Sequence, residues 1–99
     1  MGVRLDLPNG SDLGIDIPGG AWASAFQIWK LRGVSRAFIR LMDEFIPPVP
    51  SKLIGDLAIL ASVEVESRFS PEGEAKELAS RMHKLCLHAV ERGEGLVWS

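Results

Sequence analysis

Apolar and polar residues alternate along the first 17 residues of the chain. The apolar positions are Val3, Leu5, Leu7, Leu13, Ile15 and Ile17. A period of two places alternate side chains on one face of a β-strand, so this pattern predicts a β-hairpin over residues 2–17. The sequence Pro8-Asn9-Gly10 between the two apolar sets is typical of a three-residue loop whose glycine is left-handed. Such a loop would pair Leu5 with Leu13 and keep the apolar side chains on a shared face.

From residue 21 onward the apolar residues recur every three or four positions, which indicates amphipathic helices. Four helices are predicted, over residues 21–32, 35–46, 51–67 and 71–92. The last has the clearest boundaries, because Ser70 and Pro71 are typical of a helix start and Gly93 of a helix end. The end of the third helix stays open between helix and strand, since Val63-Glu64-Val65-Glu66 alternates like a strand.

The order of these elements predicts an α+β fold. An isolated hairpin is marginally stable in water, so it needs helices across its apolar face. The last five residues, Gly95 to Ser99, have the composition of a short strand and could add a third strand. We therefore expect two layers, in which an N-terminal β-hairpin, with or without that third strand, packs against about four amphipathic helices. At 99 residues, the chain is expected to form a single compact domain over residues 1–99.

The composition is that of a globular protein from a reducing compartment. Hydrophobic residues make up 46% of the chain and charged residues 24%, which excludes a disordered protein. A single cysteine excludes an internal disulfide, and the chain shows neither a signal-peptide pattern nor a run of 18 apolar residues. These features predict a cytoplasmic protein that does not enter a membrane. The net charge of −2 argues against a polybasic surface that coats nucleic acid or lipid.

A nucleophile–base pair or a metal site could be built from His83, Cys86 and His88. At about 100° per residue, Cys86 falls on the apolar stripe of the last predicted helix, whereas His88 points away from that stripe. A buried thiol is unreactive. Cys86 is therefore predicted to be a core residue and His88 a surface residue.

Two further features could bind ions. The acidic residues Asp6, Asp12 and Asp16 lack the dense spacing of a cation-binding loop, so they are predicted to form a solvated face of the hairpin. Pro18-Gly19-Gly20 matches neither of the glycine-rich patterns that hold phosphate, which indicates a plain turn. The sequence thus predicts no catalytic residue, no metal site and no cofactor, and a protein that is not an enzyme.

Three tryptophans in 99 residues are many for so small a core. They can complete the core beneath the sheet, or they can contact a partner, because tryptophan is enriched at binding hot spots. The candidate partner-binding residues are Trp22, Trp29, Val97 and Trp98. We expect a small interaction protein of the inhibitor, immunity or anti-defence type that binds another macromolecule, a protein. The open edges of the hairpin and the surplus of apolar residues also predict a homodimer.

The segment 30–42 supports an alternative function. Gly33, Val34 and Ser35 are followed by Ile39, six positions after the glycine. This segment resembles the turn and recognition helix of helix-turn-helix DNA-binding proteins. The resemblance implies a regulator that contacts DNA phosphates through basic residues. These residues would be Lys30, Arg32, Arg36 and Arg40.

One residue departs from the helix-turn-helix pattern. The position four before the glycine is normally small, because the two helices cross closely there, and this chain has Trp29. Binding of a protein is therefore the leading hypothesis and DNA binding the alternative. A third hypothesis places a small molecule between the hairpin and the helices.

Overall fold

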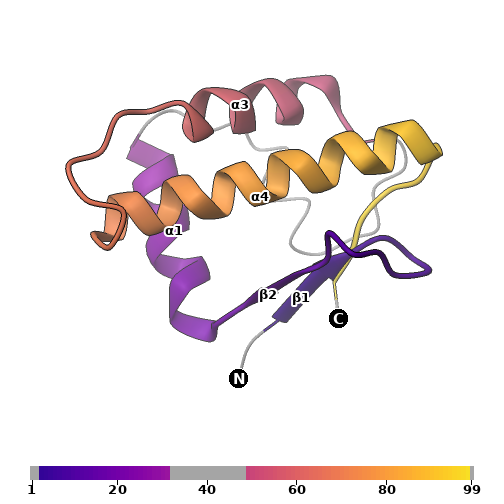
Figure 1. Cartoon of the computed structure of the whole chain (residues 1–99), viewed down its shortest axis with the longest axis horizontal. Helices are drawn as coiled ribbons and strands as arrows, with labels where there is room; N and C mark the ends of the chain where they lie inside the picture. The colour runs from indigo at the N-terminus through magenta and orange to yellow at the C-terminus, as the bar shows by residue number, and fades with distance from the viewer. Residues whose placement is uncertain (1–2, 32–48, 99) are drawn as a thin grey trace.

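The computed structural model describes residues 3–31 and 49–98 of the chain (Figure 1). In chain order, the elements are β1 (Val3–Asp6), β2 (Ile15–Ile17), α1 (Gly19–Leu31), α3 (Ser51–Ala61), α4 (Pro71–Arg92) and β3 (Val97–Trp98). The three strands form one antiparallel sheet in the order β2-β1-β3. The fold is thus mixed α+β, with helices dominant. No helix within the described ranges is long and apolar enough to cross a membrane.

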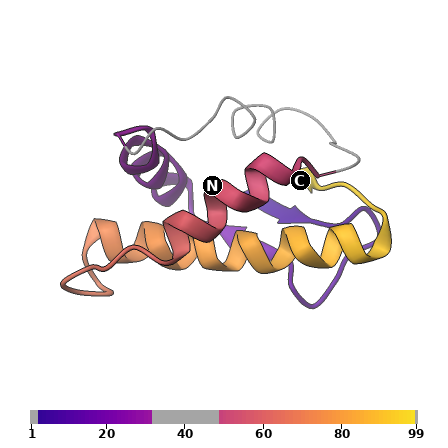
Figure 2. The same ribbon diagram turned by 90° about the horizontal axis from the view of Figure 1, so that it is seen from above.

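α4 is the longest helix, and both α1 and α3 pack against it. The side chains on its buried stripe are mostly small. The stripe consists of Gly73, Ala75, Ala79, Met82, Leu85, Cys86 and Ala89. Small residues at a contact allow helices to approach closely. Figure 1 shows α3 on one side of α4 and the sheet on the other, and the view from above in Figure 2 shows α1 beside the N-terminal half of α4.

The boundaries of α4 are those that the sequence predicts. At the start, the Ser70 hydroxyl oxygen accepts a hydrogen bond from the Gly73 N–H at 3.0 Å, and Pro71 occupies the first turn. At the end, Gly93 caps the helix and its N–H donates to the Val90 carbonyl at 3.1 Å. Each of these signals lies within three residues of the helix end, which explains why they can be recognised without tertiary information.

The expected packing of a hairpin against about four helices is wrong. The described residues contain three helices, and the helix expected over 35–46 lies outside them. The helix expected over 51–67 ends at Ala61, because both the N–H and the hydroxyl of Ser62 donate to the Ile59 carbonyl, at 3.1 and 2.9 Å, and close its last turn. The chain that follows is irregular. There Val63 and Val65 are half-buried and the alternating glutamates are exposed, which accounts for the strand-like pattern.

The predicted hairpin register is also wrong. β1 and β2 pair Val3 with Ile17 and Leu5 with Ile15, rather than Leu5 with Leu13. The expected turn does form, since Gly10 has a φ of 81° and its N–H donates to the Leu7 carbonyl at 3.0 Å. A second turn follows it, so the connection runs over residues 7–14 instead of three residues. The register shift is two residues, and for that reason Ile15 and Ile17 still face the core, while Leu13 is 40% exposed.

A buried carboxylate holds this longer loop together. Asp6 is only 8% exposed, which corrects the prediction that it belongs to a solvated face. It accepts hydrogen bonds from the Leu7 N–H at 2.7 Å, from the Ser11 hydroxyl at 2.7 Å and from the Ser11 N–H at 3.2 Å, and it lies 3.3 Å from the Arg4 guanidinium. Burial by itself raises the pKa of Asp6. The hydrogen bonds from Ser11 and Leu7, with the charge of Arg4, outweigh burial, so the net effect is a lowered pKa.

The network requires a glycine at position 14. A Cβ atom there would overlap the Arg4 guanidinium and the Asp6 carboxylate. We expect Gly14→Ala to destabilise the protein by about 1–3 kcal/mol, as is usual when atoms are added to a filled site. Gly55→Ala is the matched control, because a Cβ at this helical position meets nothing within 4 Å. The control is expected to stabilise α3 by up to about 1 kcal/mol. Equal denaturation midpoints for the two variants would contradict the close packing at Gly14.

The lowered pKa of Asp6 predicts how stability depends on pH. Because the pKa in the folded state lies below the unfolded value of about 4, the carboxylate stabilises the fold above that pH. This contribution is lost as the pH falls through the folded pKa. We expect Asp6→Asn to cost about 1–3 kcal/mol at pH 7 and to flatten the fall in the free energy of unfolding below pH 5. Asp12→Asn, at an exposed position of the same loop, should change stability by less than about 0.5 kcal/mol. Urea denaturation between pH 7 and 2.5 measures both effects.

Candidate functional site

An open groove lies where the N-terminal half of α4 meets β2 and the start of α1. Its volume is about 500 Å³, which is within the range of ligand-binding pockets. The part of α4 that lines it carries Pro71, Glu74, Leu78 and Arg81, at intervals of three or four residues that define one helix face. This face is turned away from α3, because α3 covers the other side of α4 (Figure 1). We call this feature the groove.

The floor of the groove is built from small side chains of two helices. They are Gly20, Ala21, Ser24 and Ala25 of α1 and Ala75 of α4. Ala25 and Ala75 are buried, whereas Gly20 and Ser24 are exposed. Ile17 of β2 and Leu78 of α4 add apolar surface to the walls. The result is an apolar floor that is open to solvent.

Charged side chains surround this floor. Asp16, Glu74 and Glu77 are acidic, and Arg68 and Arg81 are basic. Asp16 is neutralised by Arg4, whose guanidinium donates to it at 2.9 Å. Arg68 lies over the ring of Phe69, 4.8 Å from its centre, and Phe69 is largely exposed. Arg81 forms no ion pair with another described residue.

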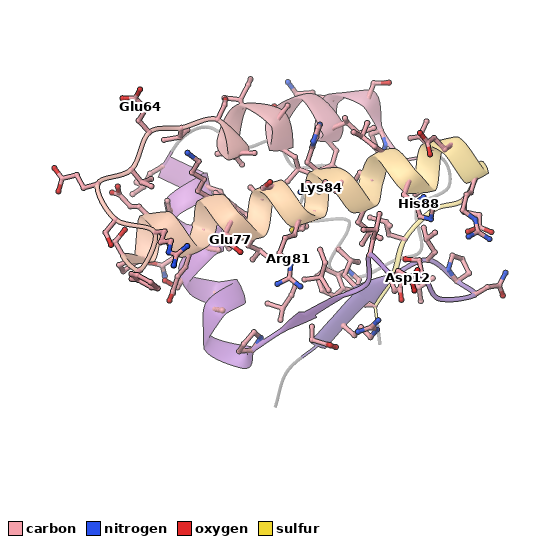
Figure 3. All side chains as sticks on the ribbon, in the orientation of Figure 1. Asp12, Glu64, Glu77, Arg81, Lys84 and His88 are labelled. Carbon is pink, nitrogen blue, oxygen red and sulfur yellow. The ribbon has the colours of Figure 1, made fainter. Side chains whose placement is uncertain are left out.

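The orientation of Arg81 is the feature that gives the groove a binding group. Figure 3 shows Glu77 and Arg81 on the side of α4 that faces β2, with Arg81 extending from the helix toward the strand. Arg68 precedes α4, whereas Arg81 is the lining residue furthest along it. The two arginines therefore lie toward opposite ends of the groove. A planar guanidinium that is not used in an internal ion pair is suited to a carboxylate.

The residues considered for catalysis do not form a reactive pair. Cys86 is fully buried in the core, and burial raises the pKa of its thiol to about 12. His83 and His88 are both half-buried on α4, so the expectation of a surface position for His88 is met only in part. Within residues 3–31 and 49–98, no group of three His, Cys, Asp or Glu side chains is arranged to hold a metal ion.

The residues predicted to bind a partner are placed in different environments. Trp29 is 1% exposed and is one of the largest side chains of the core. Val97 and Trp98 form β3 and are half-buried beside β1. The side chain of Trp22 lies outside the described part of the structure. Trp29 thus contributes to packing, and only Val97 and Trp98 have a described side chain that reaches the surface.

The residues of the DNA-binding alternative are largely outside the described ranges. Lys30 is exposed in the last turn of α1. Arg32, Arg36 and Arg40 lie between residues 31 and 49 and are not described. The helix-turn-helix hypothesis is therefore not tested by the structure.

The groove is not apparent from the sequence. A signal was present in the last helix, where Glu74, Leu78 and Arg81 share a face that is neither the buried stripe nor fully polar. The other half of the groove depends on how α1 crosses α4, and nothing local specifies that crossing. Glycine and alanine at the start of α1 indicated only a turn and a helix.

Comparison with known proteins gives no guide to the function of this groove. No family model, no curated protein and no solved structure matches the chain.

The position of Cys86 leads to a direct test. We expect its thiol to react with an aromatic disulfide reagent only when the protein unfolds, because the side chain is buried and its pKa is raised to about 12. The labelling rate of the native protein should follow the rate of global or local opening, and saturating denaturant should make labelling immediate. Complete labelling of the native protein within seconds would show that the thiol is accessible.

Proposed function

We propose that this protein is a small, non-enzymatic binding protein that acts by occupying a surface of another protein. The groove carries this proposal. It combines a volume of about 500 Å³, an apolar floor and charged groups of both signs at its rim. Protein interfaces have the same anatomy, with an apolar centre and a polar surround.

The charges of the rim favour a protein over a nucleic acid as the partner. Glu74 and Glu77 stand on the same helix as Arg81, so a phosphate backbone would meet repulsion as well as attraction. A polypeptide can supply side chains of both signs and small apolar groups for the floor. The overall charge of −2 agrees with a partner that is not a polyanion.

This mode of action suits a chain of 99 residues. A protein that holds a segment of its partner can block that segment without chemistry of its own. Inhibitors and immunity proteins work in this manner, and the proposal assigns the chain to that functional class.

A bulky residue placed in the groove tests the proposal. Ser24 is exposed and lines the floor, so Ser24→Trp should fill part of the space without entering the core. We expect it to lower recovery of the partner at least tenfold when the tagged chain is isolated from its source cells and the bound proteins are quantified. Removing one well-placed contact surface of this kind costs more than about 1.4 kcal/mol, which is a factor of ten.

Ala23→Trp is the matched control. Ala23 is the neighbouring residue of α1, is exposed and does not line the groove. It should leave recovery unchanged, and both variants should keep the wild-type circular dichroism and melting temperature. If the two variants recover the same proteins in equal amounts, or if wild type recovers none, the groove is not the binding surface.

A further inference from the structure

We infer that the groove takes an extended segment of the partner protein and that a carboxylate of this segment is held by Arg81. This inference rests on the function proposed above and specifies its occupant. Three features of the described residues support it: the dimensions of the groove, the open edge of β2, and the distribution of charge among the lining residues.

The groove fits a short extended segment. The lining of α4 runs from Pro71 to Arg81, a rise of ten residues that spans about 15 Å at 1.5 Å per residue. An extended chain of four to five residues covers about the same length, at roughly 3.3 Å per residue.

β2 offers backbone hydrogen-bonding groups that suit an extended segment. In the sheet order β2-β1-β3, β2 is an edge strand that pairs with β1 among the described strands. Its residues Asp16 and Ile17 line the groove. The outward backbone groups of an edge strand are a ready template for another strand. A partner segment beside β2 could therefore gain main-chain hydrogen bonds on one side and contact the alanine floor on the other, a known mode of peptide recognition.

The charged side chains of the lining indicate where the segment is bound most tightly. Asp16 is already paired with Arg4 at 2.9 Å, and Arg68 is stacked on Phe69. Arg81 has no such internal partner among the described residues and extends toward β2, beside the expected path of the segment (Figure 3). A carboxylate of the segment would form two parallel hydrogen bonds with this guanidinium. Glu74 and Glu77, further back along the same wall, disfavour a run of acidic residues, so one carboxylate near Arg81 is expected.

A displayed library of random eight-residue peptides, selected on the immobilised full chain, supplies the probe. We expect the recovered peptides to share one Asp or Glu at a constant distance from small apolar residues. Synthetic peptides from this set should bind wild type in a fluorescence anisotropy titration. Arg81→Glu should weaken binding at least tenfold, and a peptide with Lys at the shared acidic position should bind Arg81→Glu better than it binds wild type.

Lys84→Glu is the control. Lys84 is exposed on α4 three residues after Arg81, does not line the groove, and gives the same change in net charge. It should leave the affinity within twofold of wild type. Equal effects of the two variants, a peptide set without a shared acidic position, or no recovered peptide would each overturn the inference. The proposed function fails separately, when Ser24→Trp leaves the recovery of cellular partners unchanged.

Discussion

The close contact of α4 with α1 and α3 is the constraint on which the remaining structure depends. Ala75, Ala79 and Ala89 present little more than backbone to their neighbours, so α1 and α3 can lie near the axis of α4. Large core side chains come from each of the described helices: Trp29 from α1, Leu53 from α3, and Met82 and Leu85 from α4 itself. Together with the small residues of α4 they form the core of the described part of the chain. This core adjoins the floor of the groove, since Ala75 belongs to both.

The sequence predicts those features whose causes are local. Ser70, Pro71 and Gly93 define α4 because caps act within a turn of the helix end. Gly10 was recognised as left-handed for a similar reason, since the turn around it involves only neighbouring residues. Cys86 was assigned to the core from the period of the helix alone, and the structure confirms that it is buried.

The wrong predictions concern features of the structure that are determined by buried interactions or by residues far apart in the sequence. A carboxylate at a polar position of an alternating pattern predicts a residue exposed to solvent. Asp6 is nevertheless buried, because its carboxylate oxygens accept hydrogen bonds from the Ser11 hydroxyl and the Leu7 N–H. That network lies within the longer loop, whose strands pair two residues away from the predicted register. The groove was missed for a related reason, because its two walls are far apart in the sequence. Arg81 becomes a candidate binding residue only once β2 is known to lie opposite it.

The separation of the groove from the α3 contact has a consequence for how this protein can change over generations. α3 covers one side of α4, and the groove opens on the other, toward β2 (Figure 1). Its floor includes Ser24, which is exposed and lies outside the core, so a substitution there alters the shape of the groove with little effect on the core packing. Ala25 and Ala75 line the groove and also belong to the core, so only the exposed part of the floor can change independently of stability. Under the proposed function, substitutions at such exposed positions would let the groove follow a changing partner one residue at a time while the core stays unchanged.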